Sequence, residues 1–409
     1  MTSNGTTSKD AGGGPISVWK FGGTSVADHD RMRAVATRMV DQHRSGRRVV
    51  AVLSAMGKFS DELIDMAYKQ SSRPQLRELD ALLSVGEQIS CALAAMAVEE
   101  LGVPAVSFNG EQAGIRTDDQ FGNARLIGVN PEQITAALEQ GRIVLVTGFQ
   151  GVSPLGDTTT LGRGGSDASA VAVAAGLGLG ECEIFTDVAG VFTADPRVVP
   201  GARRLDTLRH SEMLEMAEAG AGVLQPRSVE LAAAHGIDIH LRSSFTDAPG
   251  TWIRGSGAGS AAPGAETAGV TGIAHRNQDT LYSASGVSPA KLLRALASRG
   301  AAIGTLQVSD SAGAPVLFTA PGVEPAEVTG ALAELDAAVS VHDDLGSVSV
   351  IAAGIARKPA VAAAALSALE AAGIDAEMVT TMPGRLTVHV NAADVHDAVR
   401  LLHTLFIEG

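Results

Sequence analysis

Apolar runs and amphipathic stretches alternate along the first 250 residues of the chain. Runs of strand length lie at 16–21, 48–54, 103–108, 143–149, 183–186 and 238–242. Between them, apolar positions recur with helical spacing at 28–45, 61–70, 76–100, 168–175, 211–219 and 226–235. Strands that are apolar on both faces are typical of a mainly parallel sheet covered by helices. The pattern therefore predicts an α/β domain over residues 15–254.

The composition changes at residue 255. Residues 255–269 are rich in Gly, Ser and Ala and are predicted to form a flexible linker. Two units of strands and helices follow at 270–340 and 341–409, in an order that suits small α+β domains. They carry no catalytic-looking cluster, so a regulatory or dimerising role is expected. Residues 1–14 are predicted to be a disordered tail.

Charge and cysteine content exclude several classes of function. Lys and Arg number 31 against 45 Asp and Glu, which gives a net charge of −14. Such a chain is a poor candidate for sequence-independent binding to nucleic acids or to anionic membranes. Its two cysteines, Cys91 and Cys182, cannot build a disulfide framework. We find no signal peptide or membrane span in the pattern, so we expect a cytoplasmic protein.

Two glycine-rich turns carry the strongest chemical signals. Lys20-Phe21-Gly22-Gly23-Thr24 begins in the last two residues of the predicted strand at 16–21 and offers backbone N–H groups and an ammonium group to an anion. The second turn, Gly162-Arg163-Gly164-Gly165-Ser166-Asp167, opens a predicted helix, whose N-terminus favours anions. The guanidinium group of Arg163 in this turn could hold a carboxylate through two parallel hydrogen bonds. The simpler interpretation is that Asp167 only caps the helix.

Two other segments are weaker signals taken alone. Phe185 to Arg197 forms a turn that contains Asp187, Asp195 and Arg197, and it could be a polar turn with an internal Asp–Arg pair. Glu87 lies in an otherwise apolar helical stretch. If this carboxylate is buried, it needs a cationic partner, whereas an exposed helix glutamate would need none.

Together, these segments resemble the aspartate kinase family closely over residues 16–254. The resemblance extends to Val52–Gly57, Gly148–Gly151 and Pro226–Glu230. It implies a three-layer α/β/α amino-acid-kinase domain with a mainly parallel sheet, followed by two ACT-like domains. It also implies ATP with Mg²⁺, L-aspartate as acceptor, and 4-phospho-L-aspartate as product, the first step toward lysine, threonine and methionine. A homodimer or higher homo-oligomer through the ACT-like domains is expected.

The resemblance also assigns roles to residues. Lys20 and Asp167 would be catalytic, with Asp167 orienting either Lys20 or the substrate amine. Glu87 would bind the ammonium group of aspartate and Arg163 its α-carboxylate. The other substrate-binding positions are Ser54, Ser60, Phe149, Gly164, Gly165 and Ser166. The ATP-binding positions are Lys20, Gly22, Gly23, Thr24, Thr186, Asp187, Phe192, Arg197 and Gly222. No protein metal site is implied, because Mg²⁺ would bridge the ATP phosphates.

The chain departs from the family pattern at a few positions. Gly222 stands where the family has a nucleotide-binding lysine, and Phe192 where it has a tyrosine. Losing one charge-assisted contact weakens binding by about 1.5–3 kcal/mol. In the last unit, Thr380–Gly384 lacks the usual acidic residue, and Pro383 has no N–H donor, so weakened feedback is expected. Two alternatives stay open: a kinase for another small amino-acid carboxylate, and a catalytically impaired regulatory subunit.

Overall fold

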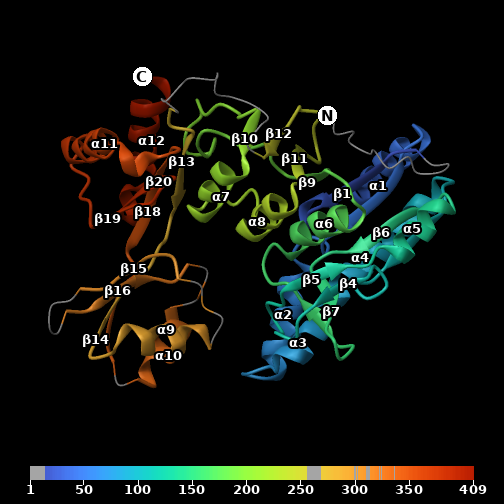
Figure 1. Ribbon diagram of the computed structural model, residues 1–409, viewed down its shortest axis with the longest axis horizontal. Coiled ribbons are helices and arrows are strands. Elements are labelled where there is room, and N and C mark those ends of the chain that lie inside the picture. Colours follow the sequence, from blue (N-terminus) through green and yellow to red (C-terminus); the bar gives the residue numbers. More distant parts are fainter. Residues whose placement is uncertain are drawn as a thin grey trace, which may run out of the picture. The chain divides into compact units, whose positions relative to one another are not determined.

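The computed structural model describes residues 14–255 and 269–409, except 299–300, 302, 310–313, 322, 324 and 336. Nearly all of the predicted tail and linker lies outside the described residues. The chain divides into two compact units (Figure 1). Met1–Val191, Asp206–His210 and Val223–Gly259 make up the first unit, and Phe192–Leu205, Ser211–Gly222 and Ser260–Gly409 the second. The second unit therefore includes two segments that precede the predicted linker.

An eight-stranded sheet forms the centre of the first unit. Its strand order is β10-β12-β11-β9-β1-β2-β6-β3. Neighbouring strands are parallel except for the antiparallel pair of β11 and β12. The strands are β1 (Ile16–Phe21), β2 (Arg48–Leu53), β3 (Ala105–Phe108), β6 (Ile143–Thr147), β9 (Glu181–Thr186), β10 (Thr207–Arg209), β11 (Asp238–Ser243) and β12 (Thr251–Arg254). This confirms the predicted mainly parallel sheet.

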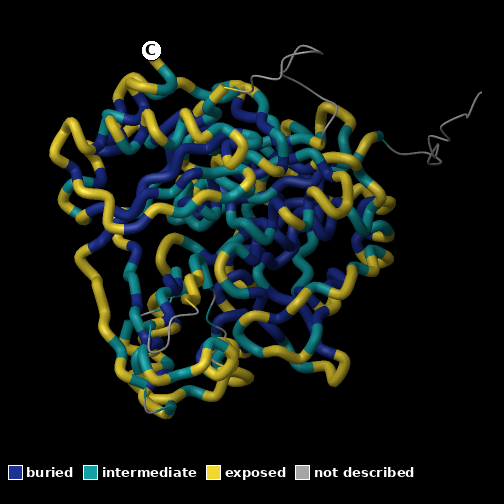
Figure 2. The backbone as a smooth tube through the Cα atoms, turned by 60° about the vertical axis from the view of Figure 1, so that its left-hand side comes forward, coloured by how far each residue is buried: buried dark blue, intermediate teal, exposed yellow. Residues whose placement is uncertain are grey.

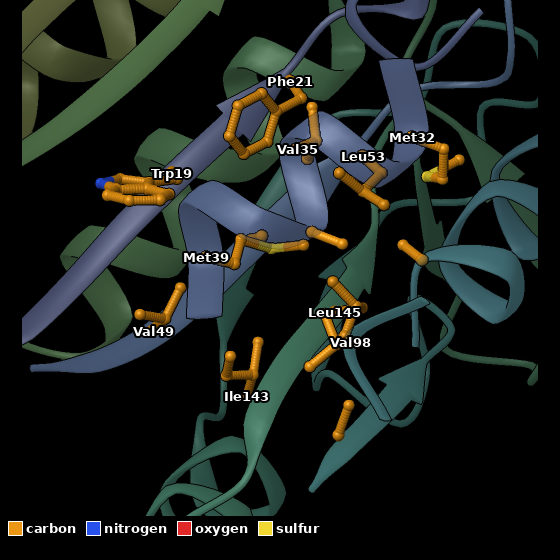
Figure 3. Close-up of a cluster of buried hydrophobic side chains, with 14 of the residues drawn as sticks. Trp19, Phe21, Met32, Val35, Met39, Val49, Leu53, Val98, Ile143 and Leu145 are labelled. Atoms are coloured by element: carbon orange, nitrogen blue, oxygen red, sulfur yellow. The ribbon is translucent and has the colours of Figure 1, made fainter. Parts of the chain in front are cut away.

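Helices cover both faces of this sheet, because each central strand is apolar on both sides. Helix α1 (His29–Arg44) and α4 (Val85–Glu100) pack on the face that carries Trp19 and Phe21 (Figure 3). Side chains of a strand alternate between faces, so Lys20 points to the opposite one. There α6 (Gly165–Gly176) packs on β1, β2 and β9, and α8 (Pro226–His235) packs on α6 and β11. The result is the three-layer arrangement expected from the family resemblance.

Several short elements of the first unit were not predicted. A second sheet, of order β5-β4-β7-β8, consists of β4 (Ile115–Thr117), β5 (Leu126–Val129), β7 (Gln150–Val152) and β8 (Thr158–Thr160). Helix α5 (Glu132–Glu139) was also missed. The helix predicted at 61–70 is α2 (Phe59–Gln70), which begins two residues earlier. The stretch predicted as one helix at 76–100 is two, α3 (Leu76–Leu83) and α4, which meet at Ser84.

One apolar stretch bears on the expectation that the chain has no membrane span. Leu76–Glu100, which comprises α3 and α4, has the length of a membrane span and contains an 18-residue window with a mean hydropathy of 1.6. A core helix passes the same test, and 44% of that window is buried. Helix α4 also packs against β3 and β6 of the central sheet. The stretch is therefore weak evidence for a membrane span.

The second unit contains two four-stranded sheets. One has the order β13-β18-β20-β19 and the other β15-β16-β14-β17. The strands are β13 (Gly272–Arg276), β14 (Leu281–Ser285), β15 (Leu306–Gln307), β16 (Val316–Thr319), β17 (Ala338–His342), β18 (Leu345–Ile351), β19 (Met378–Thr381) and β20 (Arg385–Asn391). The helices are α7 (His210–Glu218), α9 (Pro289–Ala297), α10 (Pro325–Ala333), α11 (Pro359–Ala371) and α12 (Val395–His403). All seven residues of β18 are buried, and Figure 2 shows such buried segments enclosed by exposed loops.

The pairing of β13 differs from the simple division at residue 340. β13 lies in the predicted first ACT-like segment but pairs antiparallel with β18 of the second. β17, which ends near the predicted boundary, completes the sheet of β14 and β16. Each sheet core has its own apolar cluster, with Tyr282 and Phe318 in one and Val348 and Val388 in the other. The two sheets therefore do not follow each other strictly along the chain.

Candidate active site

Lys20, at the carboxyl end of β1, pairs with Asp167 in the first turn of α6. The distance from Lys20 Nζ to Asp167 Oδ1 is 2.7 Å, and the two side chains are only 12% and 9% exposed. The N-cap residue of α6 is Gly164 and not Asp167. The structure therefore favours an ion pair over the capping interpretation, and of the two partners left open for Asp167 it shows Lys20.

The Gly22-Gly23 turn is held in place by hydrogen bonds to two neighbouring segments. The Gly22 N–H donates to the Phe185 carbonyl at 3.3 Å, and the Gly57 N–H donates to the Gly23 carbonyl at 3.0 Å. A Cβ atom at residue 23 would lie 2.7 Å from the Ala55 carbonyl oxygen, so only glycine fits. Because Gly22 already has an acceptor, the Gly23 N–H, first in a short 3₁₀ turn, is the better placed of the two for an anion.

The second glycine turn is built around Gly164, which has a φ of 70° and precedes α6. A Cβ atom at this residue would overlap the side chain of Gln225, so the turn requires glycine for both its dihedral angle and its packing. Arg227 supports the turn, since its guanidinium group donates to the carbonyls of Leu161 and Ala124 at 2.5 Å each. The turn is therefore a rigid part of the site.

Arg163 projects from this rigid turn into solvent. It is exposed, and within the part of the chain that the structure describes its guanidinium group has no hydrogen bond or ion pair. Its fork is thus available to a carboxylate. Gly165 and Ser166 lie beside it and are buried.

Asp80 is a positioning residue that the sequence analysis missed. It is fully buried on α3 and accepts hydrogen bonds from the Thr160 hydroxyl at 2.6 Å and from the backbone N–H groups of Thr160 and Gly122. Burial raises the pKa of Asp80, while these donors oppose the rise. The carboxylate links α3 to the strand that leads into the Gly162 turn. Its only sequence signal was a carboxylate within the apolar spacing of the helix.

Glu87 is buried, with 3% of its surface exposed. Its Oε1 accepts the Ala55 N–H at 3.0 Å, while its Oε2 is buried and has no hydrogen-bond partner. No cation faces it among the described residues. Burial raises the pKa of Glu87 to about 7 because the charged form loses solvation. The sequence analysis required a cationic partner for a buried carboxylate here, and the protein itself supplies none within the described residues.

Three further predicted substrate positions lie at strand and helix ends of the same unit. Phe149 has a φ of 70°, which is unusual for a residue other than glycine, and its N–H donates to the Ser169 hydroxyl at 3.1 Å. Its ring lies beside Gly165, where a Cβ atom would be 3.0 Å from Phe149 Cδ2. Ser54 follows β2, and Ser60 lies in the first turn of α2; both are half-buried. Backbone strain such as the positive φ of Phe149 is typical of functional sites.

The predicted nucleotide positions fall in both units. In the first unit, Thr24 is exposed, and the Thr186 hydroxyl donates to Asp187 Oδ1 at 3.1 Å. Phe192, Arg197 and Gly222 belong to the second unit. There Arg197 Nη2 lies 2.6 Å from Asp195 Oδ2, the internal pair weighed as an alternative for this turn. Gly222 is exposed, and a Cβ atom there would meet nothing within 4 Å.

Comparisons with known proteins identify the family of the chain. The model of the amino acid kinase family matches residues 15–243, and an ACT domain model matches residues 348–406. A curated aspartokinase of Mycolicibacterium smegmatis is 44% identical over 404 residues, with 95% of each chain covered. The chain belongs to the aspartokinase family. An aspartokinase of Corynebacterium glutamicum is 40% identical over 407 residues, covering 96% of both.

Solved aspartokinases share the fold over nearly the whole chain. Aspartokinase III of E. coli in complex with aspartate and ADP matches with a TM-score of 0.79 at 24% identity and covers 95% of this chain and 99% of its own. Aspartate kinase from Synechocystis is 35% identical with a TM-score of 0.55 and covers 96% of this chain and 69% of its own. The kinase fold and a C-terminal ACT domain are therefore established for this member of the aspartokinase family.

Proposed function

We propose that this aspartokinase transfers the γ-phosphoryl group of ATP to the side-chain carboxylate of L-aspartate, giving 4-phospho-L-aspartate and ADP. This is the first step toward lysine, threonine and methionine. The observation that carries the proposal is Glu87, a buried carboxylate whose Oε2 has no partner and which no protein cation neutralises within the described residues. A substrate ammonium group supplies the missing charge.

Two opposite charges select an α-amino acid. The Glu87 carboxylate binds the ammonium group, and the Arg163 guanidinium, which has no partner within the described chain, binds the α-carboxylate. Ser54, Ser60 and Phe149 line the substrate side, together with the backbone of Gly164, Gly165 and Ser166. Membership of the aspartokinase family supports aspartate as the acceptor.

Phosphoryl transfer here needs charge neutralisation and alignment rather than a general base. The side-chain carboxylate of aspartate is already ionised at neutral pH. Lys20 neutralises the charge on the transferring phosphoryl oxygens, and Asp167 fixes the position of the Lys20 ammonium at 2.7 Å. The Gly23 N–H adds a backbone donor.

The nucleotide binds to the residues that follow β1 and β9. Thr24, Thr186 and Asp187, all of the first unit, take part. Among the described residues, no cluster of three or more His, Cys, Asp or Glu side chains could hold a metal ion. We propose Mg²⁺ as a companion of the ATP phosphates, where it would neutralise part of their charge.

The test is a trapping assay with hydroxylamine, which converts an acyl phosphate into a hydroxamate. ATP is supplied with L-aspartate, L-glutamate or another small amino acid in turn. Hydroxamate formation with aspartate at the highest kcat/KM supports the proposal. A higher kcat/KM with another amino acid identifies a kinase for a different acceptor, and no product with any of them identifies an impaired subunit; each result overturns the proposal.

For the second unit we propose weak feedback control and a role in homo-oligomer assembly in the cytoplasm. Within that unit the Thr380–Gly384 segment is already engaged: the Gly384 carbonyl accepts the Ala352 N–H at 3.0 Å, and Arg385 pairs with Glu215 and Glu218. Pro383 adds no N–H donor. Initial rates at millimolar lysine, threonine and their mixture should fall only slightly. Strong concerted inhibition would contradict the weak-feedback proposal, and a monomer at low concentration would contradict the assembly role.

A further inference from the structure

A cavity of about 470 Å³ lies in the first unit between α1 and the sheet. Its lining comprises Trp19, Ala34, Thr37, Arg38, Asp41, Gln42, Phe185, Arg242 and Asp247. Trp19 points to the face of the sheet opposite Lys20, because neighbouring strand residues alternate. Figure 3 shows Trp19 on this face, with Met39 of α1 nearby. The cavity is therefore separate from the candidate active site.

Two arginines of this cavity share one aromatic ring. The guanidinium carbons of Arg38 and Arg242 lie 5.1 Å and 5.5 Å from the centre of the Phe185 ring, within reach of a cation–π interaction. Both belong to cavity walls from different elements, α1 and β11. Arg38 and Arg242 pair with two different carboxylates, and no carboxylate of the described residues pairs with both guanidinium groups. The space between these groups would suit an anionic group.

The two arginines use only some of their N–H donors in contacts with the carboxylates beside them. Arg242 donates from Nη1 to Glu183 Oε2 at 2.9 Å, and its buried Nε has no hydrogen-bond partner. Arg38 Nη2 is 3.6 Å from Asp247 Oδ1, and the Asp247 side chain is 96% exposed. Such an exposed pair contributes little. Within the described chain, Arg38 and Arg242 form only these ion pairs. N–H groups of both guanidinium groups therefore remain free to donate to a ligand carboxylate.

Hydrogen-bond acceptors lie at other positions of the cavity lining. Asp41 is exposed, and in the described part of the chain its side chain has neither a hydrogen bond nor an ion pair. Gln42 donates from Nε2 to the Ser17 hydroxyl at 3.3 Å, which leaves its side-chain oxygen free to accept. Ala34 and the rims of the Trp19 and Phe185 rings supply apolar surface. The cavity thus has cationic, anionic and apolar parts.

We propose that this cavity binds a free, neutral α-amino acid. The ligand carboxylate lies between Arg38 and Arg242, its ammonium group faces Asp41, and its side chain rests against Ala34 and Phe185. Two arginines and two aspartates line the cavity, and Glu183, the partner of Arg242, adds one further negative charge beside it. A zwitterion adds no net charge to this surplus, whereas a nucleotide or inorganic phosphate would add uncompensated negative charge.

The cavity is physically linked to the glycine turn of the candidate active site. The carbonyl of Phe185, whose ring is its floor, accepts the Gly22 N–H. The proposal goes beyond the proposed phosphoryl transfer and does not depend on it, because occupancy is measured as binding. Failure of the kinase assay would therefore leave this test unaffected.

The experiment is isothermal titration of the full chain with L-leucine, L-methionine and L-phenylalanine, each up to about 10 mM, a range suited to weak ligands. The variants are Arg38→Gln and Asp41→Asn, which remove one charge from each end of the cavity. Arg33→Gln is the matched control, because Arg33 is exposed on the same helix and is absent from the lining. The ligand control is 4-methylpentanoate, which is leucine without its ammonium group.

We expect saturable binding of at least one of the three amino acids, weakened at least about tenfold by either variant and unchanged by Arg33→Gln. 4-Methylpentanoate should bind at least about tenfold more weakly than leucine if leucine is the ligand. Absence of binding by all three overturns the proposal. So does binding that both cavity variants retain, since the ligand would then occupy another site, such as one in the second unit. Asp41→Asn removes no contact within the described protein, so a folding defect does not obscure the result.

Discussion

Replacing Glu87 by Gln should stabilise the protein and impair its use of aspartate at the same time. Glutamine has nearly the same shape and still accepts the Ala55 N–H at Oε1, but it carries no charge. Burial raises the pKa of Glu87 to about 7 from the ordinary value of 4.5. The two effects have opposite signs because the charge that folding disfavours is the one that the substrate ammonium group requires.

The stability effect follows from proton linkage. The folded state holds the Glu87 proton more tightly than the unfolded state, so this residue's contribution to stability is largest below pH 4.5 and is lost as pH rises to about 7. At about 1.4 kcal/mol per pKa unit, the full loss is about 3 kcal/mol. Between pH 5 and pH 8, the free energy of unfolding of Glu87→Gln should therefore gain about 2–3 kcal/mol relative to wild type.

The catalytic effect follows from the lost contact with the ammonium group. A hydrogen bond to a charged group contributes about 1.5–3 kcal/mol, so kcat/KM for aspartate should fall roughly 10- to 150-fold. KM for ATP should change little. In the wild type, kcat/KM for aspartate should fall about tenfold per pH unit below pH 7 as Glu87 takes up its proton, and the variant should lose this dependence.

Both effects can be measured on the same pair of proteins. Urea unfolding at pH 5 and pH 8 reports the stability difference, and hydroxamate formation against aspartate concentration reports the kinetics. Glu99→Gln is the matched control, because it removes an exposed carboxylate from the same helix. A stability difference that is independent of pH, or a normal KM for aspartate in Glu87→Gln, would refute the reasoning.

Three more substitutions test the remaining roles. Lys20→Ala should reduce turnover by at least about a thousandfold, as expected for loss of a preorganised charge. Comparing the melting temperature of this variant with that of Lys20→Ala/Asp167→Asn separates lost chemistry from the effect of an unpaired buried carboxylate. Near-normal turnover in Lys20→Ala would exclude the catalytic role of Lys20. Arg163→Lys should raise KM for aspartate about tenfold or more while KM for ATP stays constant, because lysine lacks the planar fork; the opposite pattern would mean that the substrates are placed the wrong way round. Gly222→Lys has open space for its side chain and should lower KM for ATP by up to about tenfold; an unchanged KM would show that another group has taken over the contact.

The regular elements of the first unit could be predicted from local patterns. The strand predicted at 16–21 is β1 with the same bounds, and the helix predicted at 226–235 is α8 with the same bounds. The strands of the second sheet escaped prediction because three or four residues are too few to show a period. The glycine turns at 22–23 and 162–165 were found because their function depends on residue type at fixed spacing.

The sequence by itself determined the family, the alternation of strands and helices, and the residues expected to carry chemistry, since all of these depend on neighbours along the chain. Only the tertiary structure decided which groups meet. It paired Lys20 with Asp167 across 147 positions, left Glu87 without a protein cation in the described chain, and joined β13 to β18. Such contacts depend on the packing of elements distant in sequence, and local periodicity carries no information about them.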